Sequence, residues 1–350
     1  MENLRLNVSL LRRRVPNLTT AAKSVGLRPA TVSNLCTGKI PVGRSEVRTL
    51  VALASLAECS LDELIIRGEN VEMIETKIKA LDLFAPLAKG GTIGLVARQK
   101  MGQLVLLSEL FFRLKKESFT TILLMPEGDY PELKDVTINT DIIVHSIEEA
   151  YEKIAEKGSI SEIVFAADRR HVLTGEIFEL QERIEAINIA SITTFLVDLT
   201  GEAADEDLPY GPLETIWQFD ADLTARHKFP AVNPIYSTSS VLEGAHLDQT
   251  HLTIQQRAQK LLRRYRELRS LVNAGGMERI PASEIQTFKR GERLEAYLTQ
   301  PFYVAEAYTG KKGESVRLHE TLQDVRKILD GSADSLAIEE LNYIGQLIEK

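Results

Sequence analysis

The chain has 350 residues, of which 44% are hydrophobic and 26% are charged, a composition typical of a globular protein with a large core and two or three domains. No apolar run reaches the roughly 18 residues of a membrane span, and the first residues lack the basic-then-apolar order of a signal peptide. We therefore expect a cytoplasmic protein with no membrane insertion.

The net charge of −8 is divided unevenly along the chain. Residues 1–68 carry ten Lys/Arg and five Asp/Glu, a net charge of +5, whereas residues 69–350 carry 32 and 45, a net charge of −13. A polyanion is therefore expected to meet the N-terminal segment, and the rest of the chain should repel nucleic acid.

Cys36 and Cys59 are the only cysteines, too few for a disulfide framework or a structural zinc site. Each lies in an apolar helical pattern, so we expect both to be reduced packing residues. No metal site is predicted.

Two short helices joined by a tight turn are predicted near the N-terminus. Ala21, Ala22 and Val25 form one apolar face of the first helix. Gly26 supplies the turn, and the second helix begins near Pro29, whose fixed φ suits a first helical turn.

The second of these helices has an apolar side and a polar side. Val32 and Leu35 would pack inward. The outward residues have mostly short side chains, which would let the helix enter a major groove. They are Arg28, Ala30, Thr31, Ser33 and Asn34.

Residues 18–64 resemble the phage-repressor (Cro/CI, Xre-like) helix-turn-helix family, including the "TG" that closes the second helix, the "IP" that enters the next one and the final "SLDEL". The resemblance implies an all-α unit of five helices, within a domain spanning residues 1–68, that binds double-stranded DNA. Bases would be faced by Arg28, Ala30, Thr31 and Ser33, and phosphates would be contacted by Thr19, Thr20, Asn34, Lys39 and Arg44.

Two alternatives stay open for this segment. Some domains of this kind serve protein contacts or assembly instead of DNA binding. The run "RRR" at 12–14 is either a solvated helix end or additional phosphate-contacting charge.

After a polar linker, "GENVEM" at 68–73, short apolar runs alternate with amphipathic helices, the order of a parallel α/β sheet. Beyond about residue 229 we expect helices only. The predicted strands are 92–96, 120–125, 141–145, 162–167 and 192–197. The predicted helices are near 101–116, 147–157 and 176–187, then 251–273, 282–299 and 319–330.

Residues 75–350 resemble the beta subunit of rotary ATP synthases. The likeness begins with "ETKIKALDLFAPLAKGGTIGL" (75–95) and resumes in "FPAVNPIYSTSS" (229–240), "RAQKLLRRYRELRSLV" (257–272) and "LTQPFYVAEAYTGKKGESVRLHETL" (298–322). It implies a RecA-like, P-loop-type nucleotide-binding domain over 69–228 and a helical C-terminal domain over 229–350, with the N-terminal barrel of the family replaced by the helix-turn-helix.

The residues that bind phosphate and magnesium in the loop of that family are replaced in this chain. Where the family has the lysine that neutralises phosphate and the threonine that holds magnesium, this chain has Gln103 and Leu104, and three loop glycines are missing. Arg98 and Lys100 could still attract a phosphate.

The other catalytic positions are also weak. Glu127 falls near the family's water-activating glutamate, and Asp168 near its magnesium-associated aspartate, although Ala167 fits that register as well; ordinary loop charge is the favoured reading of both acids. Ser240 replaces an arginine. Since phosphoryl transfer depends on positioned cations, these losses predict that the chain is not an ATPase and has no catalytic residues.

The base pocket is the best-kept part of the resemblance. Phe229, Phe302 and Tyr308 occupy positions whose rings surround adenine in the family, so ATP or ADP remains the one cofactor that the likeness leaves open; core packing is the simpler interpretation.

Three functions are weighed on this basis. The leading one is a transcriptional regulator that uses a catalytically inactive body for oligomerisation or adenine-nucleotide sensing. The alternatives are an ATP-binding or ATP-hydrolysing motor or synthase-related subunit, and a non-catalytic assembly protein. A homo-oligomer or contacts with ATP synthase-like subunits are the expected protein partnerships.

Overall fold

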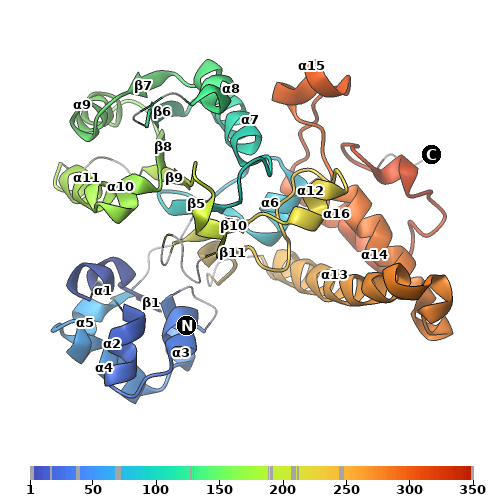
Figure 1. Ribbon diagram of the computed structural model, residues 1–350, viewed down its shortest axis with the longest axis horizontal. Coiled ribbons are helices and arrows are strands. Elements are labelled where there is room, and N and C mark those ends of the chain that lie inside the picture. Colours follow the sequence, from blue (N-terminus) through green and yellow to red (C-terminus); the bar gives the residue numbers. More distant parts are fainter. Residues whose placement is uncertain are drawn as a thin grey trace.

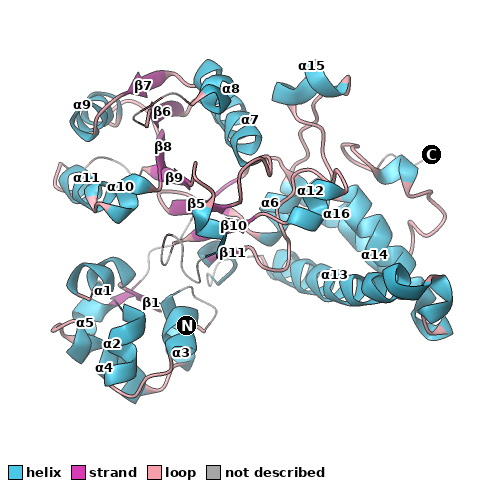
Figure 2. Cartoon of the chain, in the orientation of Figure 1, coloured by secondary structure: helices cyan, strands magenta, loops and turns pink. Residues whose placement is uncertain are grey.

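The computed structural model describes residues 4–15, 18–36, 40–67, 72–126, 128, 130–187, 189, 192–205, 210, 213–243 and 248–347. They form an N-terminal helical region, a central mixed and mostly parallel sheet with helices on both faces, and a C-terminal group of helices (Figure 1). Figure 2 shows the strands of the central sheet running from β7 (Ile142–Val144) at the top to β10 (Thr215–Gln218) in the middle, with helices beside them, and β1 (Leu4–Leu6) apart from them in the N-terminal region.

The N-terminal region contains five α-helices around their own hydrophobic core. The core includes Leu11, Ala22 and Leu53, all of which are fully buried. The helices are α1 (Val8–Arg14), α2 (Leu18–Ser24), α3 (Pro29–Cys36), α4 (Val47–Leu56) and α5 (Leu61–Leu64), with the short 3-10 helix η1 (Val42–Arg44) before α4.

This region is not purely helical, in contrast to the sequence-based expectation. Strand β1 (Leu4–Leu6) pairs antiparallel with β2 (Ile65–Arg67), so the two ends of the region are joined by a two-stranded ribbon. Leu6 of this ribbon is buried in the helical core. The pairing therefore brings the first and last described residues of the region together at one place. A three-residue strand has no periodicity that could reveal it in the sequence.

The central sheet has seven strands in the order β11-β10-β5-β9-β8-β6-β7. All neighbouring pairs are parallel except β10 and β11, which are antiparallel. The strands are β5 (Thr92–Val96), β6 (Thr120–Leu124), β7 (Ile142–Val144), β8 (Ile163–Asp168), β9 (Thr193–Val197), β10 (Thr215–Gln218) and β11 (Thr238–Ser239). A separate small ribbon joins β3 (Met73–Ile74) to β4 (Leu87–Ala88).

Strands β5, β6, β8 and β9 bury both of their faces, as the continuous apolar runs predict, whereas Ile143 in the edge strand β7 is exposed. In β6, Leu123 belongs to the core beneath α7 and α8, whereas Ile122 and Leu124 belong to the core beneath α9 and α11. The covering helices are α7 (Gln103–Lys116), α8 (Lys134–Ile138), α9 (Ile147–Lys157), α10 (Arg170–Leu173), α11 (Glu176–Glu185) and α12 (Ala221–Ala225).

The C-terminal helices pack against one another and against α6 (Lys79–Phe84), which precedes the sheet in the chain. They are α13 (Gln249–Gly275), α14 (Ile285–Tyr297), α15 (Glu306–Thr309) and α16 (Leu318–Asp330). In Figure 1, α15 stands apart from the other three at the end of an extended loop.

The five strands and the longer helices predicted from the sequence are confirmed, with ends shifted by a few residues. The expectation that strands stop before residue 229 was wrong, because β11 at 238–239 adds an antiparallel edge beside β10. Strand β10 was not foreseen either. The segment treated as a linker, 68–73, lies outside the described residues up to 71 and enters β3 at Met73.

Neither cysteine is part of a disulfide, and Cys36 is buried in the N-terminal core as expected. Among the helices in the described ranges, none is both long and apolar enough to cross a membrane.

Candidate functional site

The turn between α2 and α3 is a Schellman motif that contains Gly26. The Leu27 N–H donates to the Ala22 carbonyl (2.9 Å), and the Gly26 N–H donates to the Lys23 carbonyl (3.1 Å). These bonds satisfy two carbonyls at the end of α2 and require left-handed backbone at Gly26, whose φ is +74°. A residue without a Cβ adopts that conformation at least cost, so Gly26 sets the direction in which the chain leaves α2.

Helix α3 is held down on one side by the N-terminal core. Pro29 is its first residue, and the Arg28 carbonyl accepts hydrogen bonds from the N–H groups of Thr31 (2.9 Å) and Val32 (3.2 Å). Val32 and Leu35 are each 2% exposed. The predicted inward side is therefore confirmed, whereas Val25, expected to join the apolar face of α2, follows the last residue of that helix and is 40% exposed.

The polar side of α3 stays accessible to solvent. Arg28 and Ala30 are exposed, and Thr31, Ser33 and Asn34 are partly exposed. These five residues are the ones that the sequence pattern placed outside the core. Apart from Arg28, their side chains are short, which leaves room for the helix to enter a major groove.

Of the expected phosphate-contacting residues, Asn34 lies in α3 and the other four lie on either side of it in the chain. Arg44 ends η1 and is exposed. Thr19 and Thr20 are in α2, but their side chains lie outside the described part of the structure, as does the whole of Lys39.

Arg14, from the run at 12–14, has a structural role that sequence reasoning missed. Its Nη1 donates to the carbonyls of Ala57 (3.2 Å) and Glu58 (2.6 Å), just after the end of α4. A cation at a helix C-terminus satisfies carbonyls that have no partner within the helix and offsets the helix dipole. Arg14 is thus committed to joining α1 to α4, while the side chains of Arg12 and Arg13 lie outside the described residues.

The positive charge of the N-terminal region is concentrated before α4. Residues 3–45, which span α1 to η1, contain eight Lys/Arg and no Asp/Glu. Two of the four acidic residues that follow are engaged locally: Glu46 pairs with Arg48, and Glu63 forms a capping box with Ser60. Hydrogen bonds from the backbone and side chain of Ser60 lower the pKa of Glu63. The α2–α3 unit therefore lies within a stretch of uniformly positive sequence.

A second place where a ligand could bind is the loop between β5 and α7, residues 97–102. In the sheet order, β5 lies between β9 and β10, although the chain runs from β5 through α7 to β6 on the far side of β8. Parallel α/β sheets bind ligands at such switch points, outside the carboxyl ends of the strands. The loop therefore occupies a position where a phosphate would be expected.

Side chains of the loop and of the first residue of α7, however, accept hydrogen bonds from two of the loop's backbone amides. The Arg98 N–H donates to the Met101 sulfur (3.2 Å), and the Met101 N–H donates to Oε1 of Gln103 (3.1 Å). Gln103 is 5% exposed, so its amide closes the loop from within. Arg98 and Lys100 are exposed, and Leu104 packs against the sheet core.

Of the two acids considered for catalysis, only Asp168 is among the described residues, and both oxygens of its carboxylate accept hydrogen bonds. Asp168 ends β8 and is buried, and its Oδ1 accepts from both the backbone N–H and Nε of Arg170 (2.9 Å each). Its Oδ2 accepts from the Leu199 N–H (3.2 Å), so Asp168 joins the loops after β8 and β9. Glu127 lies outside the described residues. Ser240 begins a short 3-10 helix, and its hydroxyl is buried without a hydrogen bond in the described structure.

The three aromatic residues expected around a base are in different surroundings. Phe302 is buried in the core beneath α7, and Phe229 is partly buried against the same core, with its ring beside Gly102 of the loop. Tyr308, on α15, is 81% exposed. Phe229 is therefore the one ring of the three that both remains accessible and lies next to the loop.

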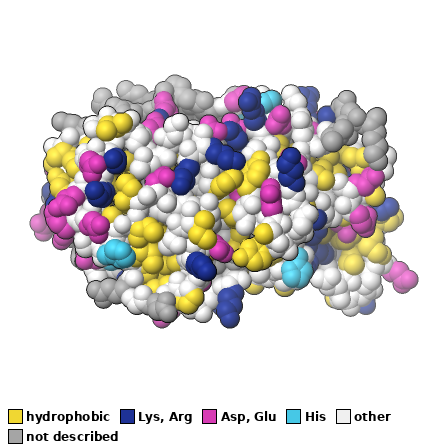
Figure 3. Space-filling view, turned by 90° about the horizontal axis from the view of Figure 1, so that it is seen from above, with side chains coloured by type: hydrophobic (Ala, Val, Ile, Leu, Met, Phe, Trp, Pro, Cys, Tyr) yellow, Lys and Arg dark blue, Asp and Glu magenta, His cyan; other side chains and the backbone are white. Residues whose placement is uncertain are grey.

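The face of the molecule in Figure 3 shows basic and acidic side chains interspersed among the described residues. The described residues contain no group of three or more His, Cys, Asp or Glu side chains that could hold a metal ion. No protein-family model matches the chain.

Proposed function

We propose that this chain is a sequence-specific DNA-binding protein, a transcriptional regulator of the Cro/CI (Xre-like) type at its N-terminus. One observation carries the proposal: α3 is fixed on the core by Val32 and Leu35, turned by the Schellman motif at Gly26, and presents a polar side within a stretch of eight basic and no acidic residues. In this proposal Arg28, Ala30, Thr31 and Ser33 face bases, and Thr19, Thr20, Asn34, Lys39 and Arg44 bind phosphates.

For the remainder of the chain we propose a RecA-like, ATP synthase beta-like body that is not an enzyme. The central position of β5 and α7 supports the family relationship. The engagement of the loop amides by Met101 and Gln103 supports the loss of phosphate chemistry, because those amides are the groups that cradle phosphate in such loops. The body then contributes oligomerisation, or senses adenine through Phe229.

The proposal is tested by selecting duplexes from a random library with the full chain, in the presence and absence of ATP and ADP. A recovered motif would establish sequence-specific recognition, and a change in enrichment with nucleotide would establish adenine sensing. Failure to bind any duplex at low salt would exclude the regulator and leave an assembly protein.

A further inference from the structure

Residues 342–347 form a strap that connects the end of α12 with α6 and α16 through hydrogen bonds. The strap follows the short 3-10 helix η8 (Glu339–Leu341) and contains no helix or strand of its own. The three places that it contacts are far apart in the chain, so only packing brings them together.

Two buried charged side chains hold the far end of the strap. Lys79 in α6 is 0% exposed and donates to the carbonyls of Ile344 (2.8 Å) and Gly345 (3.3 Å). Asp324 in α16 is also 0% exposed, and its Oδ2 accepts from the backbone N–H of Leu347 (2.7 Å). Because neither charge reaches water, polar groups of the strap replace part of the hydration that both would otherwise have.

The other end of the strap fixes the backbone just after α12. The Tyr343 hydroxyl accepts from the Phe229 N–H (3.2 Å) and donates to the His227 carbonyl. The Tyr343 N–H in turn donates to Oγ1 of Thr299 (2.7 Å). Since the ring of Phe229 lies beside Gly102 in the loop after β5, Tyr343 holds the backbone that carries this ring.

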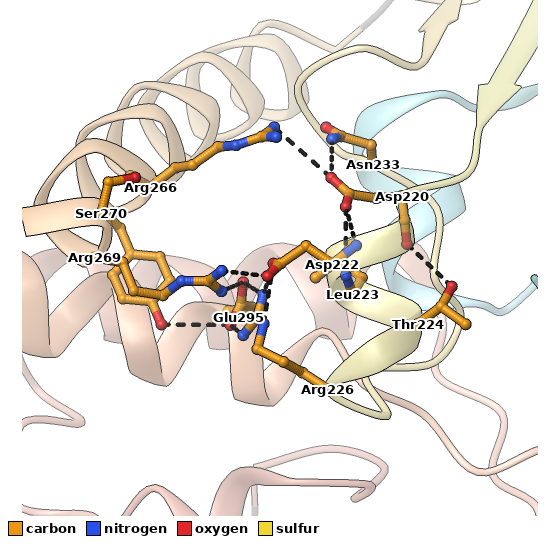
Figure 4. A network of polar contacts seen from close by, with 11 residues as sticks. Asp220, Asp222, Leu223, Thr224, Arg226, Asn233, Arg266, Arg269, Ser270 and Glu295 are labelled. Atoms are coloured by element: carbon orange, nitrogen blue, oxygen red, sulfur yellow. Dashed lines mark hydrogen bonds and ion pairs between the residues drawn. The ribbon is translucent and has the colours of Figure 1, made fainter. Parts of the chain in front are cut away.

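Helix α12 itself is anchored without the strap. Arg226, the residue after α12, binds Glu295 of α14 through both terminal nitrogens. Asp222 of α12 pairs with Arg269 of α13 (2.5 Å), and Figure 4 shows these ion pairs between α12 and the two C-terminal helices. Departure of the strap would therefore release residues 227–229 and leave α12 in place.

The closed strap has unfavourable features that opening would relieve. Asp324 Oδ1 is buried without a hydrogen bond in the described structure, and the Lys327 ammonium is 3.7 Å away from it. Tyr343 has a left-handed backbone, with a φ of +56°, which costs free energy in a residue with a Cβ. Of the six residues of the strap, Leu347 alone is buried. Few buried apolar side chains and no regular structure are typical of segments that open before the rest of a protein.

We propose that residues 342–347 are a conformational switch, which opens while the helices beneath it stay folded and which, when closed, fixes the backbone of Phe229 beside the loop after β5. The position of this ring is then controlled from α6 and α16, where the strap is held. The switch requires neither DNA nor a nucleotide, so it does not depend on the function proposed above.

Hydrogen exchange of the full chain, followed by mass spectrometry at several low urea concentrations, tests the opening. The amides of Tyr343 and Leu347 donate to side chains, and we expect them to exchange at least about tenfold faster than the hydrogen-bonded amides of α14 and α16. Their exchange should not depend on urea, because a local opening exposes little surface. A single rate and a single urea dependence for the strap and these helices would overturn the proposal.

Tyr343→Phe tests whether the strap fixes Phe229. The variant keeps the ring and removes the hydroxyl that accepts from the Phe229 N–H, so this amide should exchange about two- to tenfold faster, the usual effect of one hydrogen bond. The amides of α12 should not change. Tyr303→Phe is the control, since it removes a hydroxyl that binds Ser315. Unchanged exchange at Phe229 in Tyr343→Phe would contradict the proposal.

Leu347→Ala tests whether the two ends of the strap are coupled. The substitution removes the buried side chain at the far end, and we expect the amides of Tyr343 and Phe229 to exchange faster together. Leu336→Ala is the matched control, because Leu336 packs against the same core from outside the strap and should leave the Phe229 amide unchanged. Faster exchange at Tyr343 without a change at Phe229, or equal effects of the two leucine variants on Phe229, would exclude the switch.

Discussion

Arg113 and Glu109, one turn apart on α7, form an ion pair that is almost completely removed from solvent. The Arg113 Nε donates to Glu109 Oε1 at 2.7 Å, and the two side chains are 5% and 0% exposed. The other nitrogens of Arg113 bind the carbonyls of Glu314 (2.7 Å) and Lys77 (3.1 Å), while Glu109 accepts from the Val304 N–H (3.0 Å). This pair therefore attaches the helix that follows the loop to the segment that carries α15.

We expect Arg113→Met to destabilise the chain by about 3 to 5 kcal/mol, because it leaves the Glu109 carboxylate buried without its cation. Urea denaturation measures the loss. The double variant with Glu109→Leu should recover part of it, since the unpaired charge is then gone. Arg183→Met, which breaks an exposed pair with Glu148, is the control and should change the midpoint little. Equal effects at the buried and exposed pairs would contradict this account.

Gly26 and Gly43 offer a matched pair of substitutions in the N-terminal region. A Cβ at either position would meet no atom within 4 Å, but only Gly26 has a positive φ. Gly26→Ala should therefore cost about 1 to 2 kcal/mol from backbone conformation alone, and Gly43→Ala should be tolerated. Hydrogen exchange of amides in α2 and α3 reports the local loss. The argument fails if both substitutions have the same effect.

Lys79 provides a prediction about pH. It is fully buried and donates to the carbonyls of Ile344 (2.8 Å) and Gly345 (3.3 Å), and burial lowers its pKa to about 7. The folded chain thus releases this proton near pH 7, whereas the unfolded chain keeps it until about pH 10. Because the unfolded state binds more protons in between, this group makes stability rise with pH over that interval, by up to about 1.4 kcal/mol per pH unit.

The measurement is the free energy of unfolding at several pH values between 7 and 10, for the wild-type chain and for Lys79→Met. Methionine keeps most of the length of the side chain and removes the charge, so the difference between the two curves should grow with pH in favour of the wild type. Parallel curves would show that Lys79 does not titrate in this interval. Asp324 and Tyr297, which lie near Lys79, are present in both proteins.

Restoring the family's lysine and threonine at positions 103 and 104 should not restore ATP hydrolysis. The double variant Gln103→Lys, Leu104→Thr restores the two lost residue types, but the Arg98 N–H remains bonded to the Met101 sulfur and the missing glycines are not replaced. We expect no ATP hydrolysis above background in the wild type or in this variant, measured as phosphate release with magnesium present. Turnover that Glu127→Gln abolishes would revive the ATPase interpretation.

Base-contacting and phosphate-contacting residues can be distinguished by how their substitution changes the salt dependence and the sequence dependence of DNA affinity. Arg28→Ala should relax sequence preference with a loss of about 1 to 3 kcal/mol on the selected duplex. Arg44→Ala and Lys39→Ala should weaken binding to all duplexes alike and reduce the salt slope by about 1 each. Fluorescence anisotropy at several salt concentrations gives both quantities. Arg183→Met, in the body, is the control, and unchanged affinity in all three N-terminal variants would contradict the proposal.

The sequence alone determined the local elements of this protein. The apolar runs around β5 to β9 and the helical periodicity of α13, α14 and α16 predicted those elements, because burial of a strand or of a helix face is repeated every few residues. The same reasoning placed the turn at Gly26 and the buried Val32 and Leu35.

Only the tertiary structure decided how distant segments meet. The strand order, the antiparallel β11 and the ribbon of β1 with β2 depend on pairing between residues that are not neighbours in the chain. Gln103 was recognised from the sequence as a missing lysine, and its role as the acceptor that closes the loop became visible only from its contact with Met101. The ion pairs of Arg226 with Glu295 and of Asp222 with Arg269 have no counterpart in any local pattern, since packing and not sequence brings these residues together.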